Sequence, residues 1–269
     1  MRLRKQRGSR PMTFEAFGVS LELTLGDESL GPAVQAILPP GWAPSEAAQP
    51  TGRFGLRQTD ADQYEVTVDG EPWLKHQALD VALDLLDAQM RMMIAANAPN
   101  WTFVHAGVVA IGDAALMIPG QSFFGKTSLV VALVQAGATY LSDEYAVLDA
   151  EGRVHPYARR LSVRGDDQSV REHDVEELGG VAGEVSLGLG AVLITRYRAH
   201  AEWRPVRVSR GEGLLVLMAN TVPAQERPHQ SLQVLSRALA GSVVLKSDRG
   251  EARTVAPKLL DELAALTPP

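Results

Sequence analysis

The chain has 269 residues, of which 45% are hydrophobic, enough to build the core of one large domain or two small ones. It has no cysteine, which excludes a disulfide framework and a thiolate metal site and agrees with a reducing cytoplasm. The net charge is −6, but the first ten positions hold five basic residues and no acidic one, so the rest of the chain is acidic and a nucleic-acid partner is not expected. Nor is a membrane partner or a secretory signal expected, since no apolar run is long enough.

The N-terminal third of the chain is rich in strand patterns. We interpret residues 1–12 as a basic leader and residues 13–98 as a small strand-rich α+β unit. Residues 31–52 are rich in Pro, Gly and Ala and predict an irregular connection. Alternating or β-branched stretches predict strands at 17–25, 53–57 and 64–68.

A helix is predicted over residues 77–96, because apolar residues recur there at helical spacing until Pro99 ends the pattern. Its methionines Met90, Met92 and Met93 are compatible with a flexible partner surface, but core packing is the favoured interpretation. This helix leads into the second part of the chain.

Near the middle of the sequence lies a complete match to G-x-x-x-x-G-K-[ST]. Such a loop offers backbone N–H groups to phosphate oxygens, places a lysine on the β- and γ-phosphates, and gives Mg²⁺ a hydroxyl ligand. Residues 115–118 predict a buried strand before it, and residues 128–134 a helix whose N-terminus would face the phosphates. The expected nucleotide-binding residues are Gly120, Gln121, Ser122, Phe123, Phe124, Gly125, Lys126, Thr127 and Ser128.

Two features flank this loop. Residues 105–111 and the following strand are separated by Gly112-Asp113, which predicts an antiparallel hairpin. After the helix, Gly137 and a short strand at 139–141 lead into Asp143 and Glu144, and adjacent carboxylates directly after a strand are suited to metal binding and proton transfer.

Together these motifs resemble the catalytic domain of the HPr kinase/phosphorylase family and its HPr-kinase-related relatives. The resemblance rests on His105, the phosphate loop and residues 137–144, and covers about residues 101–165. It implies that residues 99–269 form an α/β P-loop kinase core on a mixed sheet, similar to that of phosphoenolpyruvate carboxykinase. It also implies transfer of phosphate from ATP, with Mg²⁺, to a serine hydroxyl.

The resemblance implies a role for each matching residue. Lys126 would hold the β- and γ-phosphates, and Thr127 would ligate Mg²⁺. Asp143 would take the proton from the acceptor hydroxyl, Glu144 would work at the metal, and His105 would lie beside the catalytic acid, although a structural histidine at a strand start is the alternative. This set provides the positioning, charge neutralisation and proton acceptor that phosphoryl transfer needs.

The chain departs from the family pattern in three respects. Phe123 stands where glycine is usual. Ser162 occupies the place of a glutamate that ligates metal in the family, so a second metal or phosphorolysis is in doubt. The N-terminal unit does not resemble the family's regulatory domain, so HPr is not the expected acceptor.

Arginines and acidic residues follow the matching segment. Arg164 is a candidate to brace the γ-phosphate or an acidic substrate, and Arg159 or Arg160 are weaker candidates; each has a solvated loop as the alternative. Residues 165–190 are acidic and glycine-rich and predict a solvated loop rather than a metal cluster. Further on, strands are predicted at 191–195 and 242–246, and helices at 213–219, 231–240 and 257–266.

The sequence therefore predicts an ATP-dependent kinase with a hydroxyl acceptor, most simply a serine of a peptide or protein other than HPr. Two alternatives stay open. One is a kinase for a small molecule, such as a metabolite or natural product, and the other is a nucleotide-binding regulatory module with little transfer. The oligomeric state is not predicted.

Overall fold

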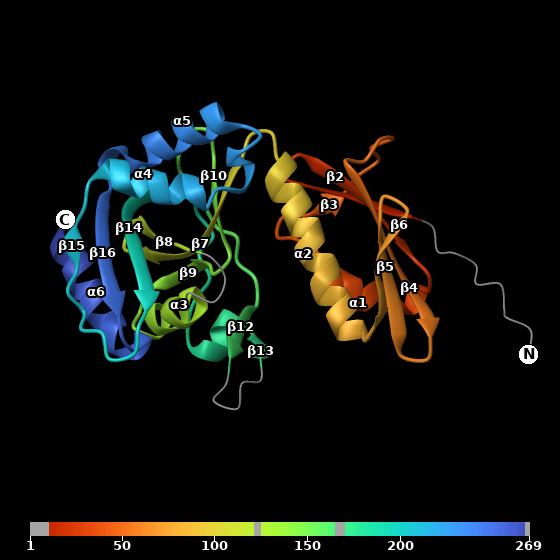
Figure 1. Cartoon of the computed structure of the whole chain (residues 1–269), viewed down its shortest axis with the longest axis horizontal. Helices are drawn as coiled ribbons and strands as arrows, with labels where there is room; N and C mark the ends of the chain where they lie inside the picture. The colour runs from red at the N-terminus through yellow and green to blue at the C-terminus, as the bar shows by residue number, and fades with distance from the viewer. Residues whose placement is uncertain (1–10, 121–124, 165–169, 267–269) are drawn as a thin grey trace, which may run out of the picture. The chain divides into compact units, whose positions relative to one another are not determined.

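The computed structural model describes residues 11–120, 125–164 and 170–266. Contacts between Cα atoms divide the chain into two units, residues 1–100 and 101–269, and each is described by itself (Figure 1). Among the described residues, no helix has the length and apolar character needed to cross a membrane.

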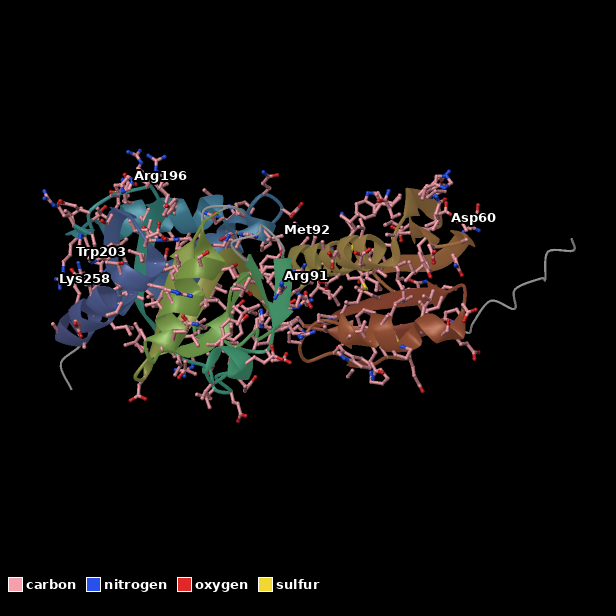
Figure 2. The ribbon with its side chains drawn as sticks, turned by 90° about the horizontal axis from the view of Figure 1, so that it is seen from below. Asp60, Arg91, Met92, Arg196, Trp203 and Lys258 are labelled. Atoms are coloured by element: carbon pink, nitrogen blue, oxygen red, sulfur yellow. The ribbon has the colours of Figure 1, made fainter. Side chains whose placement is uncertain are left out.

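The first unit is built on a sheet. Its described residues form a six-stranded sheet in the order β3-β1-β2-β4-β5-β6, in which β2 and β4 are parallel and the other neighbours antiparallel. Asp60 lies at the tip of the β4–β5 hairpin (Figure 2). The strands are β1 Met12–Ala16, β2 Val19–Leu25, β3 Ala43–Pro44, β4 Gly52–Asp60, β5 Gln63–Val68 and β6 Glu71–Gln77.

Two predictions for this unit were wrong. The strand predicted from residue 17 begins only at Val19, because Phe17 and Gly18 have positive φ and form the turn after β1. Residues 31–52 are not wholly irregular, since they contain helix α1 Gly31–Ala36 and strand β3. Pro32 does not prevent this helix, because the first helical turn has no intrahelical partner for its N–H groups.

The predicted helix of this unit is confirmed as α2, Leu79–Asn97. It packs on β2, β4, β5 and β6. Met90 and Ile94 on this helix are fully buried, so core packing is confirmed for Met90. It was wrong for Met92, which is 48% exposed. The helix ends shortly before Pro99, since a proline disfavours helical backbone in the residue before it.

The second unit holds a mixed sheet, as expected from the α/β prediction. Its described strands follow the order β11-β10-β7-β8-β14-β16-β15, and β9 also pairs with β7. The predicted hairpin is confirmed, because β7 and β8 are antiparallel, whereas β8, β14 and β16 are parallel. The strands are β7 Thr102–Ile111, β8 Ala114–Pro119, β9 Thr139–Ser142, β10 Tyr145–Leu148, β11 Val154–His155, β14 Gly188–Tyr197, β15 Val206–Arg207 and β16 Val243–Arg249.

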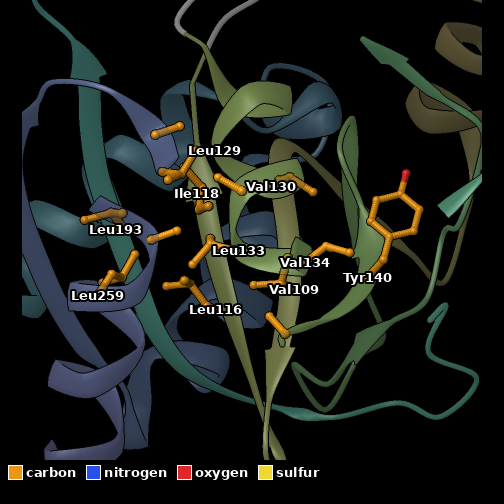
Figure 3. Packing of buried hydrophobic residues seen from close by; sticks show 14 of the residues in the cluster. Val109, Leu116, Ile118, Leu129, Val130, Leu133, Val134, Tyr140, Leu193 and Leu259 are labelled. Carbon is orange, nitrogen blue, oxygen red and sulfur yellow. The ribbon is translucent and has the colours of Figure 1, made fainter. Parts of the chain in front are cut away.

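Helices cover both faces of this sheet (Figure 1). On one face, α3 Lys126–Gln135 and α6 Ala252–Leu266 pack against Val109, Leu116 and Ile118 (Figure 3). On the other, α4 Arg210–Ala219 and α5 Pro228–Ala238 pack in a cluster with Val108 and Met117. Successive strand residues point to opposite faces, so the apolar runs of β7 and β8 supply both cores.

The structure corrects three boundaries in this unit. Residues 165–190 are not a single loop, because β13 Val170–His173 pairs with β12 Leu161–Arg164 and a 3₁₀ turn follows at Val175–Leu178. Residues 165–169 lie outside the described part. The final helix begins at Ala252 and contains Pro257, which the sequence pattern had placed at its start. Helix α5 begins with Pro228 in its first turn, earlier than predicted.

Candidate active site

Helix α3 starts directly at the lysine of the phosphate-loop motif. Gly120 follows β8, and Gly125, with φ of +78°, is the N-cap of α3. A Cβ atom at Gly125 would lie 2.6 Å from Arg249 Nη2, so both the backbone conformation and the space require glycine here. The predicted loop residues Gln121, Ser122, Phe123 and Phe124 lie outside the described residues.

The first turn of α3 contacts the predicted catalytic carboxylate. Thr127 Oγ1 donates a hydrogen bond to Asp143 Oδ2 at 3.1 Å, and Tyr140 OH donates to Asp143 Oδ1 at 3.0 Å. Tyr140 is fully buried on β9, so its ring fixes the position of the turn that carries Asp143. Hydroxyl groups therefore hold both carboxylate oxygens of Asp143.

Burial shifts the pKa of several groups at this site. It lowers the pKa of Lys126 to about 8, although attraction by Asp143 opposes the shift, and only 8% of Lys126 is exposed. It raises the pKa of the Asp143 carboxyl above its ordinary value, while the hydrogen bonds from Tyr140 and Thr127 oppose that shift. Desolvation and the Asp143 charge raise the pKa of Tyr140, which therefore stays a donor. Titratable groups with opposing shifts in one cleft are typical of catalytic sites.

His105 supports the start of the phosphate loop. Its Nδ1 lies 2.9 Å from the carbonyl oxygen of Gly120, and because a carbonyl can only accept, Nδ1 carries the proton. The His105 ring meets the edge of Tyr145 at a centroid distance of 5.7 Å, opposite it in the β7–β10 pair. His105 also lines the same cavity as Asp143, and its Nδ1 bond to Gly120 gives it a structural role at the start of the loop.

A cavity of about 700 Å³ joins these groups. Glu144 is half-buried beside Asp143 and lines it, as does Ser128. Its described lining consists of His105, Gly125, Lys126, Thr127, Ser128, Asp143, Glu144, Ser162, Val163, Tyr197, Arg249, Glu251 and Ala252. Most of the predicted site residues that the structure describes therefore share one space, while Gly120, Arg159 and Arg160 are not part of its described lining.

The candidate arginines and Ser162 lie on or near β12. Arg164 ends this strand, but the surroundings of its side chain lie outside the described part. Arg160 forms ion pairs with Glu172 and Asp174, so its charge is partly neutralised. The positive charge of Arg159 partly opposes the rise in the pKa of Asp143, so Arg159 acts electrostatically on this site.

Sequence reasoning missed three residues of the cavity that carry a polar group: Tyr197, Arg249 and Glu251. Tyr197 ends β14 and Arg249 ends β16, and they are direct partners in this parallel pair. Arg249 is 2% exposed, and its Nη2 donates to Gly125 O at 2.7 Å. The carboxyl ends of parallel strands share one sheet edge. A signal for parallel pairing of β14 and β16 with β8 could therefore have placed these residues near the phosphate loop.

The residues of the cavity fit a Mg²⁺ ion that is shared with a phosphate ligand. Thr127 and Glu144, the predicted metal residues, supply a hydroxyl and a carboxylate, and magnesium in such sites keeps few protein ligands and takes others from phosphate and water. In the described ranges, His, Cys, Asp and Glu do not form a cluster of three or more that could hold a metal by itself. A partial ligand set of this kind is suited to a metal–nucleotide substrate.

Comparison with known proteins adds little to this picture. No protein-family model matches the chain, and no curated protein sequence matches it significantly. Among solved structures, the Hpr(Ser) kinase/phosphatase of Coxiella burnetii matches over 61% of this chain and 94% of its own, with 15% identity and a TM-score of 0.35. A likeness at this level carries no argument about function, and family membership stays a prediction from the motifs.

Proposed function

We propose that this protein is an ATP-dependent phosphotransferase with a hydroxyl acceptor, most simply a serine of a peptide or protein other than HPr. One observation carries the proposal: Thr127, at the N-terminus of α3, donates a hydrogen bond to Asp143 in a cavity that the buried Lys126 also lines. A phosphate-binding helix start, a cation and a carboxylate of raised pKa are thus in one place.

The residues have complementary tasks in this reaction. Lys126 holds the β- and γ-phosphates, and the N–H groups at the start of α3 bind phosphate oxygens. Asp143 accepts the proton of the acceptor hydroxyl while that oxygen bonds to the γ-phosphorus and the bond to the β,γ-bridging oxygen breaks, which releases ADP. Thr127, with Glu144, would hold Mg²⁺, which when bound neutralises phosphate charge.

A labelling experiment tests this function. The protein is incubated with Mg²⁺, γ-labelled ATP and a lysate of source cells that lack it, beside Lys126→Ala, Asp143→Asn and the control Asp113→Asn in the exposed β7–β8 turn. We expect a labelled product whose rate falls by about 10²- to 10⁴-fold in Asp143→Asn, because general base catalysis contributes that much. Asp143→Asn should still bind ATP, and Asp113→Asn should label normally. Unchanged labelling in Asp143→Asn would refute Asp143 as the base.

The nature of the labelled product separates a peptide or protein acceptor from a small molecule.

One observation favours the regulatory alternative, namely that Ser162 lines the cavity where the family resemblance implies a metal-ligating glutamate. If that alternative holds, the protein would bind ATP tightly without forming any labelled product, and Asp143→Asn would leave ATP binding unchanged.

A further inference from the structure

The strand order gives the cavity a direction. Across the sheet, the turn that carries Asp143 lies beside β7, the phosphate loop follows β8, and then come the ends of β14 and β16. Because β8, β14 and β16 are parallel, their carboxyl ends meet at one edge. The end of β8 and the start of α3 therefore lie between the Asp143 side and the side of Tyr197 and Arg249.

Arg249 contacts the last glycine of the loop, and Tyr197 lies beside that glycine. Arg249 donates to the carbonyl oxygen of Gly125, and a Cβ at Gly125 would lie 3.8 Å from Tyr197 Cβ. The Arg249 guanidinium lies over the Tyr197 ring, 5.8 Å from its centroid. This residue pair is thus attached directly to the glycine before Lys126.

The Tyr197 ring is held in place but accessible. Its hydroxyl donates to Glu251 Oε1 at 2.8 Å, while 46% of the residue is exposed. Arg249 is buried and, among the described residues, its Nε has no hydrogen-bond partner. An oriented, half-exposed aromatic ring is suited to stacking on a flat heterocycle, and a carboxylate at its edge can accept hydrogen bonds from sugar hydroxyls.

We propose that Tyr197 stacks on the base of the nucleotide donor, that Glu251 orients the Tyr197 ring, and that Arg249 positions both the ring and Gly125. This inference rests on the proposed function. If Asp143 takes the acceptor's proton, the γ-phosphate lies toward Asp143, and the nucleoside extends to the opposite side of the loop. Tyr197 is the aromatic residue that lines the described cavity on that side.

The test compares binding of Mg·ATP and of inorganic tripolyphosphate by calorimetry. The variants are Tyr197→Ala, Tyr197→Leu, Tyr197→Phe and Lys126→Ala, with Leu232→Ala on the exposed side of α5 as control. We expect Tyr197→Ala and Tyr197→Leu to lose about tenfold in ATP affinity, as is usual when a stacking aromatic is removed, with tripolyphosphate affinity unchanged. Tyr197→Phe keeps the ring and should retain most of the ATP affinity, and Leu232→Ala should match the parent.

The outcomes separate the two proposals. If tripolyphosphate binding needs Lys126 but the Tyr197 variants bind ATP as the parent does, the base-stacking role is overturned and the proposed function stands. Equal losses for ATP and tripolyphosphate in Tyr197→Leu would also overturn it, because the defect would then lie in the loop. If neither ligand binds the parent protein, both proposals fail.

Discussion

Each unit of the chain has a cavity beside its sheet, but the charged side chains of the two cavities differ in how they are paired and buried. In the first unit, a cavity of about 390 Å³ is lined by Arg53 and Arg57. These form ion pairs with Glu22 and Glu65, so each cation has its own carboxylate. The partly exposed Arg53–Glu22 pair contributes little energy. The carboxylate of Glu65 is buried, and its pair with Arg57 neutralises that charge.

In the second unit, burial is the main cause of the shifted pKa values. Desolvation is the largest influence on the pKa of both Lys126 and Asp143. Burying these charged groups costs stability, which an incoming phosphate and metal can offset. A cavity alone therefore does not indicate function in this protein, whereas buried charged groups with shifted pKa values do. We therefore expect Arg53→Ala to leave phosphate binding unchanged.

The pH dependence of phosphate binding is the largest effect expected from this difference. Because the pKa of Lys126 is about 8, tripolyphosphate affinity should fall as pH rises above 8, by up to about 100-fold at pH 10. Calorimetric titrations across this range measure the loss. In Lys126→Met, affinity should be low at every pH and this step should be absent.

Folding stability should respond to the same group in the opposite direction. Since the pKa of Lys126 is lowered from 10.5 in the folded state, the unfolded chain binds more protons between pH 8 and 10.5. The Lys126 contribution to the free energy of unfolding therefore rises with pH through this window. The difference in unfolding free energy between the parent and Lys126→Met measures it, and a difference independent of pH would contradict the shifted pKa.

A pair of glycines provides the next effect. Gly125 and Gly70 both have positive φ, but a Cβ at Gly125 would meet Arg249. A Cβ at Gly70 would have no atom of the described residues within 4 Å. Gly70→Ala should cost about 1 kcal/mol of stability from left-handed backbone alone and leave tripolyphosphate affinity unchanged. Gly125→Ala should lower that affinity by at least about tenfold, because strain and steric conflict both fall on the loop. Similar affinities in the two variants would contradict the role of Arg249 at the loop.

Tyr140→Phe should have the smallest effect. It removes a donor to Asp143 that lowers the pKa of this carboxyl, so that pKa should rise further. The acidic limb of the pH profile of kcat/KM for phosphate transfer should shift upward, with a few-fold loss of rate at neutral pH. Tyr64→Phe, on β5 of the first unit, serves as the control and should leave the profile unchanged.

Local patterns predicted the elements that depend on neighbours in sequence. The β7–β8 hairpin and the start of α3 were predictable because turn residues and the phosphate-loop motif determine them within a few positions. Helix α1 was missed because a segment rich in proline and glycine lacks periodicity, although proline is compatible with a first helical turn.

Pairing across long sequence distances was not predictable. Tyr197 and Arg249 meet only because β14 and β16 are adjacent and parallel, and neither strand pattern indicates its partner. A charged residue near the end of a strand also gives no sign that it will be buried, as Arg249 is. The family resemblance ended before both residues, so it could not add them to the candidate site.

Strand β7 has a consequence for how this chain can change in length. One edge of β7 pairs with β8, which leads to the phosphate loop, and the other pairs with β9 and β10, which flank Asp143. The spacing between the phosphate loop and the proposed catalytic base Asp143 is thus set by the width of a few hydrogen-bonded strands. Substitutions leave such a spacing intact, whereas one inserted residue shifts the register and turns side chains to the other face. Extra length is compatible with the site at the exposed Gly112-Asp113 turn, at the opposite end of the hairpin.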